Sequence, residues 1–177
     1  MNAINHFKTI TAHKLMVMKY CFRVGLYKQG LLHDLSKYQW VEFSAGVKYF
    51  RGNESPNWAQ KVKEGYSAAW LHHKGRNKHH TEYWIDYGTS YDEGMVGMKM
   101  PTKYVVETFI DRIAASKNYQ KEAYTDDSPL KYYERGKDNT IMHPESRVLL
   151  EDLLKRLSES GEEAVFDYIR KELLKNK

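Results

Sequence analysis

The sequence predicts an all-α protein, a compact bundle of about seven or eight helices. Three observations support this prediction. Apolar residues recur at offsets near three and four through much of the 177-residue chain, prolines stand where helices are expected to begin, and no segment alternates convincingly between apolar and polar residues. Hydrophobic residues make up 41% and charged residues 29%, with no internal repeat or long linker. We therefore expect residues 1–177 to form a single domain.

Two helices are expected in the N-terminal part of the chain. The first runs from about Thr9 to Lys28 and stops at Gly30, because glycine is favoured just after a helix end. The second runs from Leu31 to Phe50 and ends at Gly52. Its apolar face consists of Trp40, Phe43, Val47 and Phe50.

The third expected helix begins at Ser55 and Pro56, which together are typical of an N-cap followed by proline in the first turn. Its apolar stripe continues as far as His73, and Gly75 ends it. The stripe consists of Trp58, Val62, Tyr66 and Ala69. Residues 85–99, with three glycines and no sustained period, predict a loop that could act as a lid.

Pro101 begins the next expected helix, and its main apolar stripe contains Val105, Phe109, Ile110 and Ile113. Asp111 lies off this stripe, on a face that carries no long charged side chain. Its neighbours on that face are Tyr104, Thr108 and Ala115. This placement favours a carboxylate that points into a cleft.

Two further helices are expected to start at Ser128–Pro129 and at His143–Pro144, with Gly136 and Gly161 separating segments. We interpret His143 as a helix-entry residue. The last part of the chain is amphipathic, and its apolar positions are Val148, Leu149, Leu153, Leu157, Val165, Phe166, Ile169 and Leu173. We expect these helices to form a scaffold with one face packed on the core. A partner-helix or dimer interface, and thus a homo-oligomer, is the alternative.

The composition and charge of the chain limit the classes of function and partner that we expect. A formal charge of +5 and a pI near 9.1 favour anionic partners such as phosphate esters, but the lysines are dispersed and no nucleic-acid motif is present, so nucleic acid is the less favoured partner. Cys21 is the only cysteine, which excludes a disulfide framework and a thiolate zinc site. The sequence has neither a signal-like N-terminus nor a long apolar span, so we expect a cytoplasmic protein that does not bind a membrane.

The most informative motif is the dipeptide His33-Asp34, followed by Lys37. An imidazole and a neighbouring carboxylate can reach one divalent ion, and a lysine one turn later can meet a phosphate. Four of the eight histidines in the chain follow within nine positions: His72, His73, His79 and His80. His13 on an earlier helix and Asp111 on a later one complete a mixed nitrogen and oxygen set that predicts a metal site.

This order of residues resembles the HD-domain superfamily of metal-dependent phosphohydrolases over residues 13 to about 115. The resemblance implies a helical bundle in which residues of about 9–120 form the metal-site core and about 128–177 a scaffold. It also implies that one metal ion is bound by His13, His33, Asp34 and Asp111. Lys37 would lie near a substrate phosphate. The segments around 31–43 and 70–84 also look like an uncharacterised family of small bacterial and phage proteins.

Members of that superfamily with a second metal recruit histidines between the dyad and the last aspartate. On its helix, His73 is expected to point inward and His72 to lie near the edge. His80 is slightly preferred over His79, so His73 and His80 are the expected ligands, and His72 and His79 are expected to be outer or substrate contacts. The expected cofactor is a divalent ion (Mn, Fe, Co, Ni, Zn or Mg), one ion with a second left open.

The resulting hypothesis is a phosphohydrolase that acts on a nucleotide or related phosphate monoester or diester through a metal-activated water. Asp34 would orient that water, and Lys37, Arg76 and Arg112 would contact the phosphate. Aromatic residues that could stack on a base are Tyr83, Trp84 and Tyr87. The alternatives are a non-catalytic metal- or nucleotide-binding sensor, a basic nucleic-acid adaptor and a di-iron oxygenase.

Overall fold

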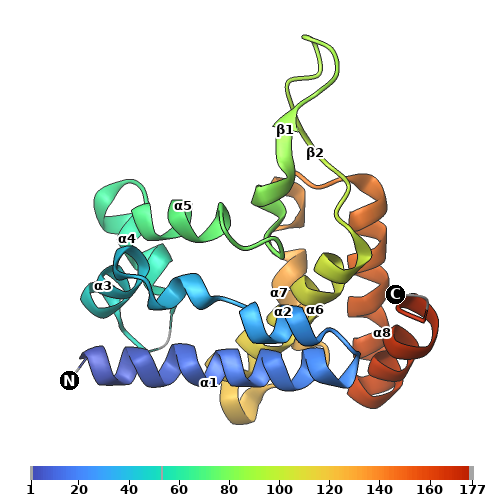
Figure 1. Cartoon of the computed structure of the whole chain (residues 1–177), viewed down its shortest axis with the longest axis horizontal. Coiled ribbons are helices and arrows are strands. Elements are labelled where there is room, and N and C mark those ends of the chain that lie inside the picture. The colour runs from blue at the N-terminus through green and yellow to red at the C-terminus, as the bar shows by residue number, and fades with distance from the viewer. Residues whose placement is uncertain (1, 53, 176–177) are drawn as a thin grey trace.

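The computed structural model describes residues 2–52 and 54–175. Over these residues the fold is mostly helical, with eight α-helices and one two-stranded hairpin (Figure 1). The α-helices are α1 (Asn2–Arg23), α2 (Tyr27–Leu32), α3 (Trp40–Tyr49), α4 (Pro56–Glu64), α5 (Ala68–Lys74), α6 (Thr102–Gln120), α7 (Ser128–Glu134) and α8 (Pro144–Tyr168). Four 3-10 turns, η1 (Leu35–Tyr38), η2 (Thr81–Trp84), η3 (Lys121–Ala123) and η4 (Lys137–Asn139), and a π-helical end, η5 (Ile169–Leu173), complete the helical elements. The all-α prediction is confirmed.

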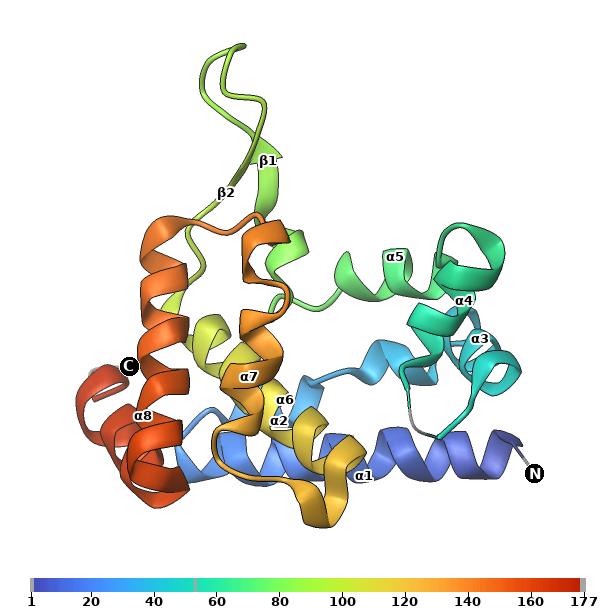
Figure 2. The same cartoon turned by 180° about the vertical axis from the view of Figure 1, so that it is seen from behind.

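The core is built around α6, which packs against α1 and α8. The stripe predicted for this helix is fully buried, and Val106 and Ala114 join it. Burying one such aliphatic or aromatic side chain stabilises the fold by roughly 1.5–3 kcal/mol. In Figure 2, α7 and α8 run across the direction of α1. The other side of α6 carries polar side chains, which point towards the interior between α1 and α5.

The end of the first helix differs from the prediction. α1 ends at Arg23, and Gly25 takes a left-handed conformation (φ 81°) that glycine adopts without strain. Gly30 does not stop a helix but lies inside α2, where a Cβ atom would meet the Cβ atom of Cys21 at 3.0 Å. Gly30 is therefore explained by the close packing of α2 on α1.

The prediction of one continuous helix from Leu31 to Phe50 is wrong. The chain leaves α2 at Leu32, passes through a turn at Asp34 with φ 54°, continues as η1 and starts α3 at Trp40. An isolated left-handed residue breaks the helical hydrogen-bond ladder. This break bends the chain at the dipeptide that carries the predicted chemistry.

The predicted helix from Pro56 to His73 is also interrupted. Gly65 (φ 81°) ends α4, and α5 begins after Ser67, whose hydroxyl accepts a hydrogen bond from the Trp70 amide at 3.0 Å. The expected buried stripe is exposed at three positions, Trp58 (58%), Val62 (68%) and Tyr66 (57%). α4 buries Ala59 and Gln60 instead, so a different face of this helix meets the protein.

The segment expected to be a loop contains a short antiparallel hairpin. β1 (Ile85–Tyr87) pairs with β2 (Met95–Gly97) in the register Ile85 with Gly97 and Tyr87 with Met95. The hairpin projects away from the helices (Figure 1). Strands of three residues are too short to show an alternating pattern, which explains why the sequence did not predict them.

The C-terminal helices start where proline predicted them, α7 at Ser128 and α8 at Pro144. The His143 side chain caps α8 by accepting a hydrogen bond from the Glu145 amide at 3.2 Å. Gly161, with φ 78°, interrupts the regular geometry within α8. Most of the predicted apolar stripe is buried or partly buried, whereas Val148 is 67% exposed.

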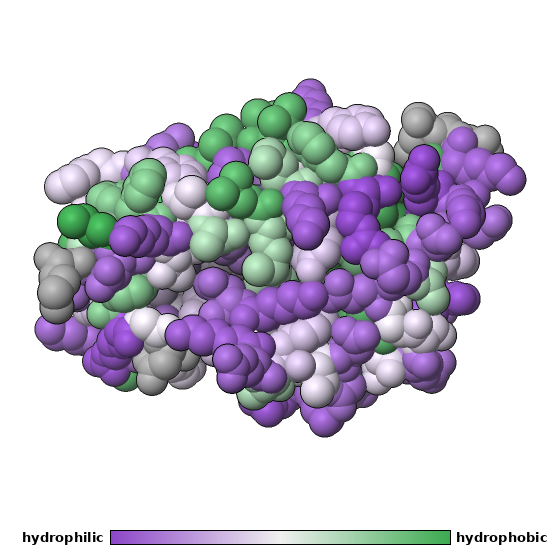
Figure 3. Space-filling view, turned by 90° about the horizontal axis from the view of Figure 1, so that it is seen from below, coloured by the Kyte–Doolittle hydropathy of each residue, from purple (hydrophilic) through white to green (hydrophobic). Residues whose placement is uncertain are grey.

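The surface along α1 is mixed in character. Figure 3 shows that hydrophobic side chains gather in one part of this face and that hydrophilic side chains cover much of the rest. α1 itself exposes Ile4, Phe7 and Leu15. Across residues 2–52 and 54–175, no helix combines the length and apolar character that a membrane-spanning segment requires.

Candidate metal centre

The His33-Asp34 dipeptide lies at the turn between α2 and η1. His33 follows the last residue of α2, and Asp34 adopts the left-handed conformation (φ 54°, ψ 23°) that aspartate tolerates better than most residues. Both residues are 2% exposed. Lys37, one turn later, places Nζ 2.6 Å from Oδ2 of Asp34. The turn thus directs the imidazole and the carboxylate into the interior, with a lysine beside them.

The first group of potential ligands contains His13 from α1, His33, Asp34 and Asp111 from α6, whose ligand atoms all lie within 4.8 Å of one another. Nε2 of His13 lies 2.9 Å from Oδ1 of Asp111, and Nε2 of His33 lies 3.3 Å from Oδ2 of Asp34. Atoms bound to one ion at about 2 Å lie roughly 3–4 Å apart. The structure therefore brings together the four residues that the HD-domain resemblance implied.

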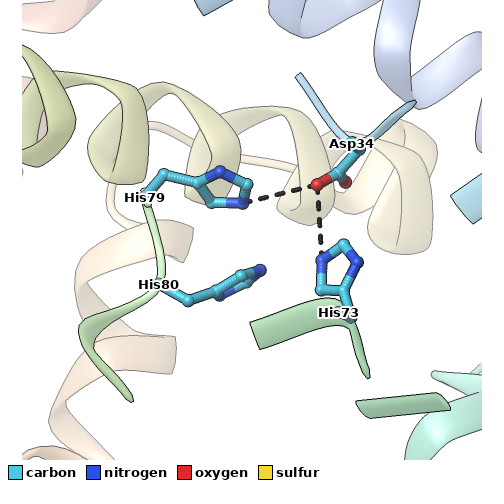
Figure 4. Close-up of side chains that lie close together, drawn as sticks. All are labelled: Asp34, His73, His79 and His80. Atoms are coloured by element: carbon cyan, nitrogen blue, oxygen red, sulfur yellow. Dashed lines mark ion pairs between the residues drawn. The ribbon is translucent and has the colours of Figure 1, made fainter. Parts of the chain in front are cut away.

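A second group contains Asp34, His73, His79 and His80 (Figure 4), again within 4.8 Å of one another. Oδ1 of Asp34 lies 3.3 Å from Nε2 of His73 and 3.5 Å from Nε2 of His79. Oδ2 of the same carboxylate faces the first group. Asp34 is thus shared between two groups. His79, expected only as an outer or substrate contact, contributes its Nε2 atom here alongside His80.

Six of these ligand atoms are buried and form no hydrogen bond of good geometry among the described residues, although Oδ2 of Asp34 is ion-paired with Lys37 and Nε2 of His13 faces Asp111. They are Nε2 of His13, His33, His79 and His80, and both carboxylate oxygens of Asp34. A buried polar atom without such a partner costs roughly 1–3 kcal/mol. Imidazole nitrogen together with carboxylate oxygen is the donor set of first-row divalent ions. The buried groups could hold metal ions, and their donor atoms fit that role.

Two buried glutamates hold the histidines from behind. Oε1 of Glu107 lies 3.0 Å from Nδ1 of His33 and 3.3 Å from Nδ1 of His79. Glu42 lies 2.8 Å from Nδ1 of His73. An imidazole that donates its Nδ1 proton to a carboxylate turns the lone pair of Nε2 towards a metal. These contacts therefore hold the histidines in an orientation in which Nε2 could bind a metal.

Sequence reasoning missed both glutamates. Glu107 precedes Asp111 by four residues on α6, so the two share a helix face, and the apolar residues Val106 and Ile110 immediately precede them. An acidic residue one turn before a predicted ligand was the available signal. Glu42 on α3 is 6% exposed and also lies 2.6 Å from Nδ1 of His72. His72 therefore contacts Glu42 and is absent from both ligand groups.

The two aspartates are held in the ionised state. Burial acts to raise the pKa of the Asp34 carboxyl, but His33, Lys37 and His73 outweigh it and hold this pKa well below its usual range. Burial also acts to raise the pKa of Asp111, but His13 and His33, whose Nε2 atoms face this carboxylate, outweigh it and hold the pKa well below its usual range. Both carboxylates are consequently charged near neutral pH.

The histidines differ in the direction in which their pKa is shifted. Burial, together with two neighbouring histidines, holds the pKa of His80 well below its usual value, and burial and the charge of Lys37 lower the pKa of His13. For His33, burial acts in the same direction, but Asp34 and the other facing carboxylates outweigh it and raise the pKa. His13 and His80 are therefore neutral at pH 7, the form in which imidazole binds a metal.

A cavity of about 550 Å³ adjoins the centre, and its wall includes Asp111, His79 and His80. Arg112 also lines it, with an Nε atom that is buried and has no hydrogen-bond partner among the described residues. Aromatic side chains on the wall are Trp58, Trp70, Tyr119 and Tyr132. The centre is thus reached through a cavity that offers a cation and aromatic surface.

The remaining predicted residues lie elsewhere. Arg76 is absent from the lining of this cavity and instead lines a smaller one, while its guanidinium donates to the carbonyl oxygen of His72 at 3.2 Å. Tyr83, Trp84 and Tyr87 do not line the larger cavity either, and Tyr87 is 76% exposed on the hairpin. The structure therefore separates Arg76 from Arg112 and does not place the three aromatic residues against the centre.

Comparison with known proteins gives one match. A family model described as "Family of unknown function (DUF5662)" matches residues 2–156, a range that includes every residue of both ligand groups. No curated protein and no solved structure matches the chain.

Proposed function

The chain belongs to a family of unknown function, DUF5662, and from its buried site we propose that it is a metal-dependent phosphohydrolase. The proposed substrate is a nucleotide or a related small phosphate monoester or diester. One observation carries the proposal: two groups of potential ligand atoms share Asp34, and six buried atoms among them form no hydrogen bond of good geometry among the described residues. A buried polar cluster of this kind is costly unless it binds something.

The residues that would hold metal ions follow from the two groups. His13, His33 and Asp111 would hold one ion with Asp34, and the second group would hold another through the other oxygen of Asp34. A divalent ion bound there supplies Lewis acidity, which lowers the pKa of a bound water towards about 7 and offsets phosphoryl charge. The metals that suit these donors are Mn, Fe, Co, Ni, Zn and Mg.

The protein's own residues would position the substrate. Arg112, a partly buried cation on the wall of the larger cavity, is suited to bind the phosphate, and Lys37 adds positive charge beside Asp34. Trp58 and Trp70 offer flat apolar surface to a base. A cavity of about 550 Å³ is within the range of small-molecule sites, roughly 300–1,000 Å³. The resemblance to the HD-domain superfamily supports the same interpretation.

The test joins elemental analysis to an assay of phosphate release. Protein purified without chelators is analysed for first-row metals and Mg and is assayed on a panel of nucleotides and phosphate esters. Asp34→Asn is expected to lose both metal and phosphate release, whereas Asp167→Asn, a change at a surface ion pair with Lys171, is expected to retain both. Absence of bound metal in the unaltered protein contradicts the proposal. Bound metal with no turnover on the panel favours the sensor instead.

A further inference from the structure

A second cavity, of about 190 Å³, is bordered by four cationic side chains. Lys28 comes from α2, Arg76 and Lys78 from the segment after α5, and Lys103 from the start of α6. These three segments lie near one another in the middle of Figure 1. We call this cavity, with its four cations, the basic cavity.

The four cations are not paired with carboxylates in the part of the chain that the structure describes. None of them forms an ion pair with a carboxylate among the described residues. Lys78 and Lys103 instead share one ring, with Nζ atoms 6.0 Å and 5.2 Å from the centroid of Tyr104. Like charges gathered at one concave surface attract an anion.

The basic cavity lies behind the metal centre. Glu107, His33 and His79 also line it, and the Glu107 carboxylate, which is 5% exposed, engages the Nδ1 atoms of the two histidines. The Nε2 atoms of the same histidines face Asp34 on the other side. Asp111 and His80 line the larger cavity and not the basic one. A ligand in the basic cavity would therefore not touch the Nε2 atoms that face the centre.

We propose that the basic cavity binds a small phosphate-bearing anion at a second site, which adjoins the metal centre on the Nδ1 side of His33 and His79. A phosphate group offers several acceptor oxygens in different directions, which matches donors that approach from three segments of the chain. The small volume of the cavity favours a compact group over an extended polymer. This inference does not depend on the proposed hydrolysis, because it rests on cations that lie outside both ligand groups.

The test is a calorimetric titration of the full-length protein with inorganic phosphate, compared across variants. Lys78→Ala/Lys103→Ala is expected to weaken phosphate binding by about tenfold or more, through loss of two cations. The matched control is Lys8→Ala/Lys19→Ala, which removes the same charge from exposed positions on α1 and is expected to leave binding unchanged. Equal weakening by both double variants would show a general charge effect and overturn the proposal.

Two further arms separate the basic cavity from other sources of binding. Asp34→Asn disrupts both ligand groups and is expected to retain phosphate binding; loss of binding would place the phosphate at the metal centre and contradict the proposal. Titration with a short DNA duplex tests the polymer alternative. If Lys78→Ala/Lys103→Ala weakens duplex binding and leaves phosphate binding unaffected, the cations form a nucleic-acid surface and the proposal is wrong.

Discussion

Nδ1 of His33 donates a hydrogen bond to Oε1 of Glu107 at 3.0 Å. The same oxygen lies 3.3 Å from Nδ1 of His79, and the two histidines belong to different ligand groups around Asp34. One buried carboxylate therefore orients one ligand of each group. The pKa of Glu107 is lowered, since hydrogen bonds from these histidines outweigh burial, so it is charged at neutral pH.

This relationship predicts that Glu107→Gln weakens metal binding in both groups. An amide has a single acceptor oxygen and no charge, and loss of such a supporting contact typically lowers metal affinity about 10–100-fold. Glu42→Gln is the comparison, because among the ligands of the two groups Glu42 contacts His73 alone. Competition with a chelating dye, measured as successive equivalents of metal are added, shows whether the variant lowers the affinity for both metal ions or for only one. A Glu107→Gln effect on one equivalent alone contradicts the relationship.

Metal binding is expected to stabilise the fold through Asp34. An ion that binds only the folded chain adds about 2.7 kcal/mol at a free concentration one hundred times its Kd. Manganese or zinc should therefore raise the thermal midpoint of chelator-treated protein, as measured by circular dichroism. Asp34→Asn, which alters the residue common to both groups, is expected to abolish most of this increase. An equal increase in the variant would mean that the metal binds elsewhere.

Gly46→Ala is expected to destabilise the protein although alanine favours helices. A Cβ atom at position 46 on α3 would lie 2.0 Å from Nε2 of His6, whose ring is buried against Phe43 and Phe50. The overlap should cost roughly 1–3 kcal/mol, which exceeds the helix-propensity gain of about 1 kcal/mol. Urea denaturation measures the change. Gly136→Ala, where a Cβ atom meets nothing within 4 Å, is the control and should change stability little.

Cys21 is expected to be inert in the folded protein. Burial raises the pKa of its thiol, and the side chain is fully buried, so neither thiolate nor access is available at neutral pH. A thiol reagent such as an aromatic disulfide should react only after unfolding in urea. Stoichiometric labelling of the native protein within minutes would contradict this expectation.

Phe109→Ala is expected to lower the free energy of unfolding by about 3–5 kcal/mol, because it leaves a cavity in the fully buried centre of α6. Val148→Ala is the matched test of the exposed position on α8 and should change stability by no more than about 0.5 kcal/mol. Chemical denaturation measures both. A large loss for Val148→Ala would indicate that this face is covered in solution.

Much of the fold could be predicted from local patterns. Proline at positions 56, 129 and 144 marked helix starts, and the apolar stripe of α6 is buried as expected. Glycine was less informative, since Gly25 and Gly65 break helices through left-handed conformations while Gly30 serves close packing inside one. The exposure of Trp58 shows the same limit, because helical spacing predicts a stripe but not which face meets the protein.

The sequence by itself determined the helical class and identified His13, His33, Asp34 and Asp111 as residues that the structure brings within 4.8 Å. Only the tertiary structure decided that Asp34 is shared, that His79 joins the second group, and that Glu107 supports both. It also separated Arg76 from Arg112 into different cavities. The physical reason is that helix formation depends on neighbours three and four residues apart, whereas a buried site depends on which helix faces pack together across the chain.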